Sequence, residues 1–71
     1  MATKEQYELG ARRLAKSIRE TSDMQEKSRL MTYLGNARYN QFLCYKDRRA
    51  RNLATNCYLA AKLLSNRATA A

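Results

Sequence analysis

The chain has no histidine, proline or tryptophan, and only two glycines and two cysteines among its 71 residues. Without histidine it lacks the side chain that most often acts as a general base near neutral pH. Its serines have no evident activating neighbour, and its acids lie mostly beside bases on polar helix faces. We find no constellation for nucleophilic, metal-assisted or carboxylate-pair catalysis, so we expect a protein that is not an enzyme and takes no small-molecule substrate.

The two cysteines, Cys44 and Cys57, stand thirteen positions apart. A zinc site usually has four ligands, and here neither histidine nor a close cysteine pair is present to supply them. The sequence therefore predicts no metal site and no cofactor. Buried, reduced thiols are expected in preference to a disulfide, as is usual for a cytoplasmic protein.

Long apolar runs are also missing. No uninterrupted stretch approaches the roughly 18 residues that span a bilayer, and no apolar leader with a cleavage site begins the chain. We expect a cytoplasmic protein with no membrane partner. Binding of the last helix to anionic lipid is a weaker alternative, because alanine and cysteine dominate its apolar face.

The scarcity of helix breakers favours helix almost throughout, because alanine, leucine and long charged residues are common. A chain of this length has room for one small core, and a partner or a second copy often adds stability at this size. We therefore predict an all-α protein: a compact three-helix bundle that forms a single helical domain over residues 1–71.

The first helix is predicted over residues 4–20. Thr3 and Gln6 have the spacing of a capping box, and Glu8 precedes Arg12 by four residues, the favourable order for a helical ion pair. One face of this helix is apolar and is formed by Tyr7, Gly10, Ala11, Leu14 and Ile18.

The second helix is predicted over residues 23–46, capped by Ser22 or Asp23. Gly35 is either a helix stop or a kink, and we favour a continuous helix because one broad apolar arc then results. The arc contains Leu30, Met31, Leu34, Ala37, Phe42, Cys44 and Tyr45.

The third helix is predicted over residues 48–66, capped by Asp47, with frayed residues after it. Its core face is rich in small residues: Ala50, Leu53, Ala54, Cys57, Tyr58, Ala61 and Leu64. Leu59 and Leu63 project on the opposite side. They are candidates for contact with a second copy of the chain or another protein, unless they are simply two isolated surface leucines.

Charge is segregated along the chain. Residues 36–71 contain seven bases and the single acid Asp47, and so hold +6 of the total net charge of +8. Such a field attracts polyanions or acidic protein surfaces. The seven bases are Arg38, Lys46, Arg48, Arg49, Arg51, Lys62 and Arg67.

Aromatic residues are interleaved with these bases. Tyr33, Tyr39 and Tyr45 are six positions apart, so one core cannot bury all three, and Tyr39 is the one expected on the surface. Phe42 and Tyr45 are expected in the core. Exposed aromatic planes beside arginines suit stacking on unpaired bases together with phosphate contacts.

Two functions follow from this pattern. The first is a small basic regulator that binds nucleic acid with little sequence specificity. The second is a protein-interaction module, conceivable as virus-encoded, that docks its basic face on an acidic surface of a larger host machine such as RNA polymerase. In either case the predicted contacts are Arg38, Tyr39, Lys46, Arg48, Arg49, Arg51 and Lys62, with Leu59 and Leu63 as apolar anchors.

Overall fold

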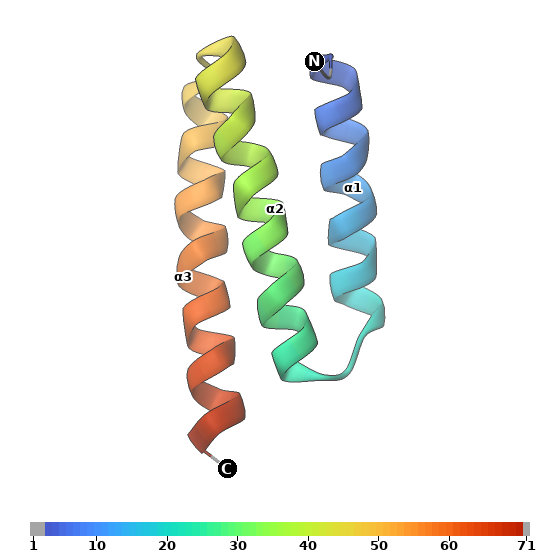
Figure 1. The fold of residues 1–71 in the computed structure, drawn as a ribbon, viewed down its shortest axis with the longest axis vertical. Coiled ribbons are helices and arrows are strands. Elements are labelled where there is room, and N and C mark those ends of the chain that lie inside the picture. Colours follow the sequence, from blue (N-terminus) through green and yellow to red (C-terminus); the bar gives the residue numbers. More distant parts are fainter. Residues whose placement is uncertain (1–2, 71) are drawn as a thin grey trace.

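Three helices make up almost all of the structure, a computed structural model that describes residues 3–70. They are α1 (Lys4–Glu20), α2 (Met24–Tyr45) and α3 (Arg48–Ala70). No strand occurs in the described part of the chain. The prediction of a compact all-α three-helix bundle is confirmed (Figure 1).

The helix starts are set by short polar side chains. Thr3 and Gln6 form the predicted capping box, with bonds of 2.8 Å from the Thr3 amide to Gln6 Oε1 and 3.2 Å from the Gln6 amide to Thr3 Oγ1. Of the two alternatives for α2, Asp23 is the N-cap, and its carboxylate accepts from the Gln25 amide at 2.9 Å. Asp47 caps α3 as predicted.

The central helix is α2, which packs against α1 on one side and α3 on the other (Figure 1). Short connections make each pair of neighbours antiparallel, so the start of α1 and the α2–α3 junction lie at the same end of the molecule. Within residues 3–70, no Cα atom of α1 comes within 8 Å of one in α3. The helix α2 therefore presents packing surfaces in two directions, which explains why its apolar arc is broad.

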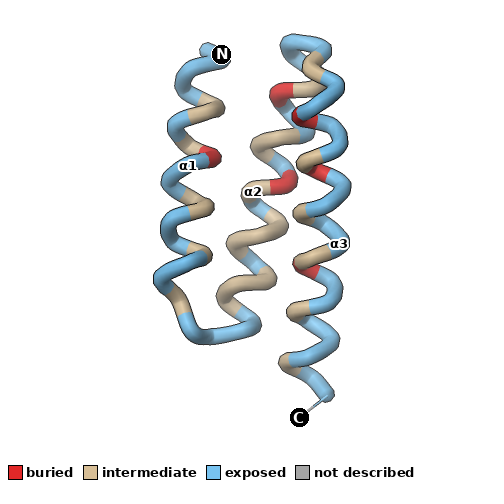
Figure 2. Tube along the Cα trace, turned by 180° about the vertical axis from the view of Figure 1, so that it is seen from behind, coloured by how far each residue is buried: buried red, intermediate tan, exposed pale blue. Residues whose placement is uncertain are grey.

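Small residues dominate the core. The fully buried apolar side chains in the described part are all alanines, and Figure 2 shows buried positions on the sides where helices meet. They are Ala11, Ala50, Ala54 and Ala61. The leucines and methionine of the predicted apolar faces are only half-buried. Because little large apolar surface is fully buried, the free energy of unfolding is expected to be small, of the order of 5 kcal/mol.

Close approach of α2 and α3 depends on Gly35, which is buried against the ring of Tyr58. A Cβ atom at Gly35 would lie 2.7 Å from Tyr58 Cε1. The ring is held in place by a bond of 2.6 Å from its hydroxyl to Asn36 Oδ1, and a second link runs from Ser28 Oγ to the Ala61 carbonyl at 2.7 Å. Gly35 is therefore a packing residue and not a helix stop.

Four expectations are wrong in detail. Tyr58, expected on the core face of α3, is 38% exposed, although one edge of its ring packs against Gly35. Cys44 is exposed, although it lies close enough to Tyr7 of α1 to interact with it. Tyr45 is also exposed, although its ring packs edge-on against Tyr7 at a centroid distance of 6.2 Å. Finally, α3 continues to Ala70, beyond the predicted end at residue 66, since nothing in the sequence breaks it; Ala71 lies outside the described residues.

Candidate nucleic-acid interface

The junction between α2 and α3 is a tight turn of two residues. Lys46 adopts the left-handed conformation that closes α2, and its amide donates to the Phe42 carbonyl at 2.7 Å. Asp47 then starts α3: its Oδ1 accepts from the amides of Arg49 and Ala50 at 3.0 and 3.3 Å. One oxygen of the Asp47 carboxylate thus serves to cap α3.

The bases that follow are not neutralised within the chain. Arg48, Arg49 and Arg51 are exposed, and α3 contains no acid along its whole length. None of the ion pairs found among residues 3–70 involves a base of α3. The folded protein therefore keeps the charge segregation seen in the sequence, with exposed bases at the start of α3 that form no ion pairs within the described part of the chain.

Helical geometry divides these arginines between two sides of α3. The guanidinium carbon of Arg51 lies over the ring of Phe42, 5.5 Å from its centroid. Arg49 lies on the other side, where it lines a cavity of about 180 Å³ with Glu8 and Arg38. The structure therefore brings Lys46, Arg48 and Arg51 together, and we call these three residues the basic corner.

An aromatic and apolar surface adjoins the basic corner. Phe42 and Leu43 line a groove of about 410 Å³ with Lys46 and Arg48, which we call the aromatic groove. The ring of Tyr39 packs against Phe42 at a centroid distance of 5.9 Å with the planes tilted by 50°, and remains exposed as predicted. Phe42 is half-buried, so its placement is close to the expected one.

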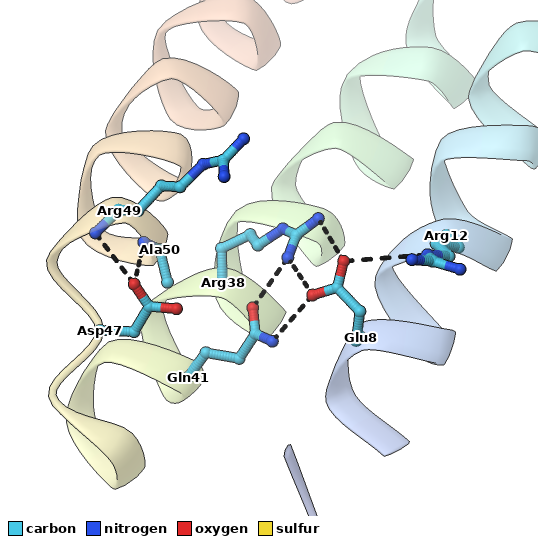
Figure 3. A network of polar contacts seen from close by, with 7 residues as sticks. All are labelled: Glu8, Arg12, Arg38, Gln41, Asp47, Arg49 and Ala50. Atoms are coloured by element: carbon cyan, nitrogen blue, oxygen red, sulfur yellow. Dashed lines mark hydrogen bonds and ion pairs between the residues drawn. The ribbon is translucent and has the colours of Figure 1, made fainter. Parts of the chain in front are cut away.

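Arg38 occupies a different environment from the one predicted. Its side chain is only 19% exposed and points toward α1, where Nη1 lies 2.7 Å from Glu8 Oε2 (Figure 3). The same nitrogen donates to Gln41 Oε1 at 3.0 Å, and Gln41 Nε2 donates to Glu8 Oε2 at 3.2 Å. Arg38 therefore joins α2 to α1 and is not a free cation of the interface.

Sequence reasoning misses this network because its strongest local signal is a different pair. The spacing pairs Glu8 with Arg12, and that contact exists, but at 3.9 Å and with an Arg12 side chain that is 77% exposed. Exposed pairs of this kind contribute little to stability. Gln41 is buried and carries no charge, so only the three-dimensional packing shows its role.

The hydrogen bonds among Glu8, Arg38 and Gln41 make the free energy of unfolding depend on pH in the acid range. The bonds from Arg38 and then Gln41 hold the pKa of Glu8 below its usual value of 4.5. A lowered pKa in the folded state stabilises the protein above about pH 4.5, and this contribution disappears as the pH falls through the lowered value. We expect Glu8→Gln to lower the melting temperature at neutral pH and to flatten its decline in acid. Glu20→Gln, at an exposed position at the C-terminal end of the same helix, is the control.

The remaining predicted residues lie elsewhere on α3. Lys62 is eleven residues beyond Arg51, which places it about 16 Å further along the helix axis. Leu59 and Leu63 are 58% and 60% exposed and lie one turn apart on the outer face, away from α2. They form a second surface that is separate from the aromatic groove.

Other kinds of site find no support in the described residues. Both cysteines are free, and burial raises the pKa of the Cys57 thiol. No cluster of three or more potential metal ligands occurs among residues 3–70, and no helix in this range combines the length and apolar character that a membrane span requires. The chain matches no protein-family model, no curated protein and no solved structure.

Proposed function

We propose that this protein binds nucleic acid through the basic corner and the exposed side chain of Tyr39. The observation that carries the proposal is the position of the arginines at the beginning of α3. Arg48 and Arg51 of the basic corner both lie among the first four residues of this helix, and its first turn contains no acid. Phosphates would supply the missing negative charge, and guanidinium groups bind phosphate in a bidentate manner.

This position is unfavourable for folding, which argues that it serves another purpose. A helix carries partial positive charge at its N-terminus, so acids there stabilise it and bases destabilise it by about 0.3–1 kcal/mol each. The helices α1 and α2 follow this rule, with Glu5 and Glu26 in their first turns. The helix α3 has three arginines among its first four residues and no acid in its first turn, so the N-cap Asp47 is the only negative charge at its start. A polyanionic partner would convert this internal cost into binding free energy.

Salt dependence tests the proposal directly. If the three bases of the basic corner each contact one phosphate of a single strand, affinity should fall about 20-fold between 50 and 200 mM salt. Fluorescence anisotropy with labelled DNA and RNA oligonucleotides, both single-stranded and duplex, measures this. Failure to bind any of them at the lower salt concentration would exclude the proposed function.

A second candidate function is docking on an acidic protein surface through the outer face of α3. Leu59 and Leu63 are exposed one turn apart, and Lys62 lies between them in the sequence. A second copy of the chain is a poor occupant, because a symmetric contact would bring like charges together. This function gains support if nucleic acid fails to bind and an acidic protein is retained after nuclease treatment.

A further inference from the structure

The aromatic groove has a composition that phosphate binding alone does not explain. Two of its four lining residues, Phe42 and Leu43, are apolar, and Leu43 is 56% exposed. The other two, Lys46 and Arg48, are bases of the basic corner. Its volume of about 410 Å³ falls within the range of clefts that hold small organic groups. An apolar floor between cations suits a ligand that has both a planar apolar group and anionic groups. The planar group would contact the apolar residues, and the anions would contact the bases.

The aromatic side chains beside the groove provide faces for stacking. Tyr39 packs against Phe42 on one side, and the guanidinium of Arg51 lies over the Phe42 ring. These contacts fix the position of Phe42 and leave the outer part of Tyr39 in solvent. Aromatic and guanidinium planes are the groups on which unpaired bases stack in proteins that bind single strands.

A duplex and a single strand would use this surface differently. In a duplex the base faces are stacked on each other, so only phosphates and groove edges reach a flat protein surface. The basic corner could contact such a backbone, but Phe42, Leu43 and Tyr39 would gain nothing. A single strand offers phosphates to the bases and an unpaired base to the apolar floor, so it satisfies both parts of the surface.

We propose that the aromatic groove accepts an unpaired nucleobase, and that the protein therefore binds single-stranded nucleic acid in preference to duplex. This inference rests on the proposed function and specifies the class of nucleic acid at the same site. The base stacks on Tyr39 and contacts Phe42 and Leu43, while Lys46, Arg48 and Arg51 hold the neighbouring phosphates.

The test compares a single strand with the duplex of the same length and sequence, as DNA and as RNA, for the wild-type protein and for Tyr39→Ala. We expect the wild-type protein to bind the single strand more tightly, and Tyr39→Ala to weaken that binding roughly tenfold while leaving duplex binding unchanged. Tyr33→Ala is the matched control: Tyr33 lies on the same helix and is 50% exposed, compared with 42% for Tyr39, whereas Tyr39 is the one that packs against Phe42 of the groove.

A second variant, Leu43→Ala, keeps the test decisive if Tyr39→Ala does not fold, because Leu43 lines the groove and is more exposed. It should also weaken only single-strand binding. Equal binding of both forms, unaffected by either variant, would overturn the inference and leave the proposed function intact. If no nucleic acid binds at low salt, both the preference for single strands and the proposed function are wrong. Displacement of the single strand by polyglutamate at similar concentration would show that the groove does not recognise a base.

Discussion

Replacing Arg48 and Arg51 with glutamate is expected to weaken nucleic-acid binding at least about 100-fold while leaving the fold intact. Each arginine that contacts a phosphate contributes roughly 1.5–3 kcal/mol, so loss of both corresponds to at least about 100-fold in affinity. The residual binding should also depend less on salt, because about one phosphate contact remains. Anisotropy titrations at two salt concentrations measure both effects.

Stability should change little in this variant, which separates it from a folding defect. Arg48 is the first residue of α3, so the change to glutamate places negative charge where the helix favours it. Against this, loss of the contact between Arg51 and Phe42 removes about 0.5–1 kcal/mol. A melting temperature within about 5 °C of the wild-type value is expected, since about 1 kcal/mol shifts it by roughly 4–8 °C in a domain of this size.

The control makes the same change in net charge on another helix. Arg13 and Arg19 are exposed on α1, and Arg13→Glu with Arg19→Glu lowers the charge by the same four units. This protein should keep most of its affinity. Equal loss in both double variants would mean that net charge, and not the basic corner, governs binding. The single variant Arg49→Glu is a second control within α3. It should also keep most of its affinity, because Arg49 lies on the side facing Glu8.

Replacing Gly35 with alanine is expected to destabilise the protein by about 1–2 kcal/mol, although alanine is the better helix former by about 1 kcal/mol. The new Cβ would lie 2.7 Å from Tyr58 Cε1, so the ring must move and its bond to Asn36 must lengthen or break. Gly10→Ala provides the opposite result, because a Cβ there meets nothing within 4 Å. It should stabilise the protein by about 0.5–1 kcal/mol. Urea unfolding of both variants gives the two free energies.

The role of Tyr58 can be isolated with a double variant. When Tyr58 is first changed to alanine, the obstruction at Gly35 is removed, and Gly35→Ala should then stabilise α2 as Gly10→Ala stabilises α1. If Gly35→Ala remains destabilising in that background, contact with the Tyr58 ring is not the reason for glycine at this position.

The helices were predictable from the sequence because their signals are local. Thr3 with Gln6 and Asp47 with the residues after it specify helix starts through side chains only a few positions away. Tyr39 is exposed as expected, but its spacing did not single it out, because Tyr33 and Tyr45 are exposed as well. The helix starts depend on local signals and not on which helices meet.

The arrangement of the arginines was not predictable, because it depends on the partner helix. The sequence shows Arg38 and Arg51 as equivalent bases, but α1 supplies a carboxylate to Arg38 and α2 supplies the Phe42 ring to Arg51. The separation of Arg49 from Arg51 likewise depends on which side of α3 packs against α2. For Gln41 no sequence signal exists, since an uncharged polar residue normally faces solvent.

The contact of α1 with α2 alone has a consequence for how the protein opens. The helix α1 is held at one end by the Tyr7–Tyr45 and Glu8–Arg38 contacts, and within residues 3–70 its backbone packs closely against α2 and not against α3. It can therefore detach without separating α2 from α3, and this partial opening costs less than global unfolding. The α2–α3 hairpin would keep the basic corner and the aromatic groove during such an event. Local unfolding would thus involve α1, whereas binding would involve α2 and α3.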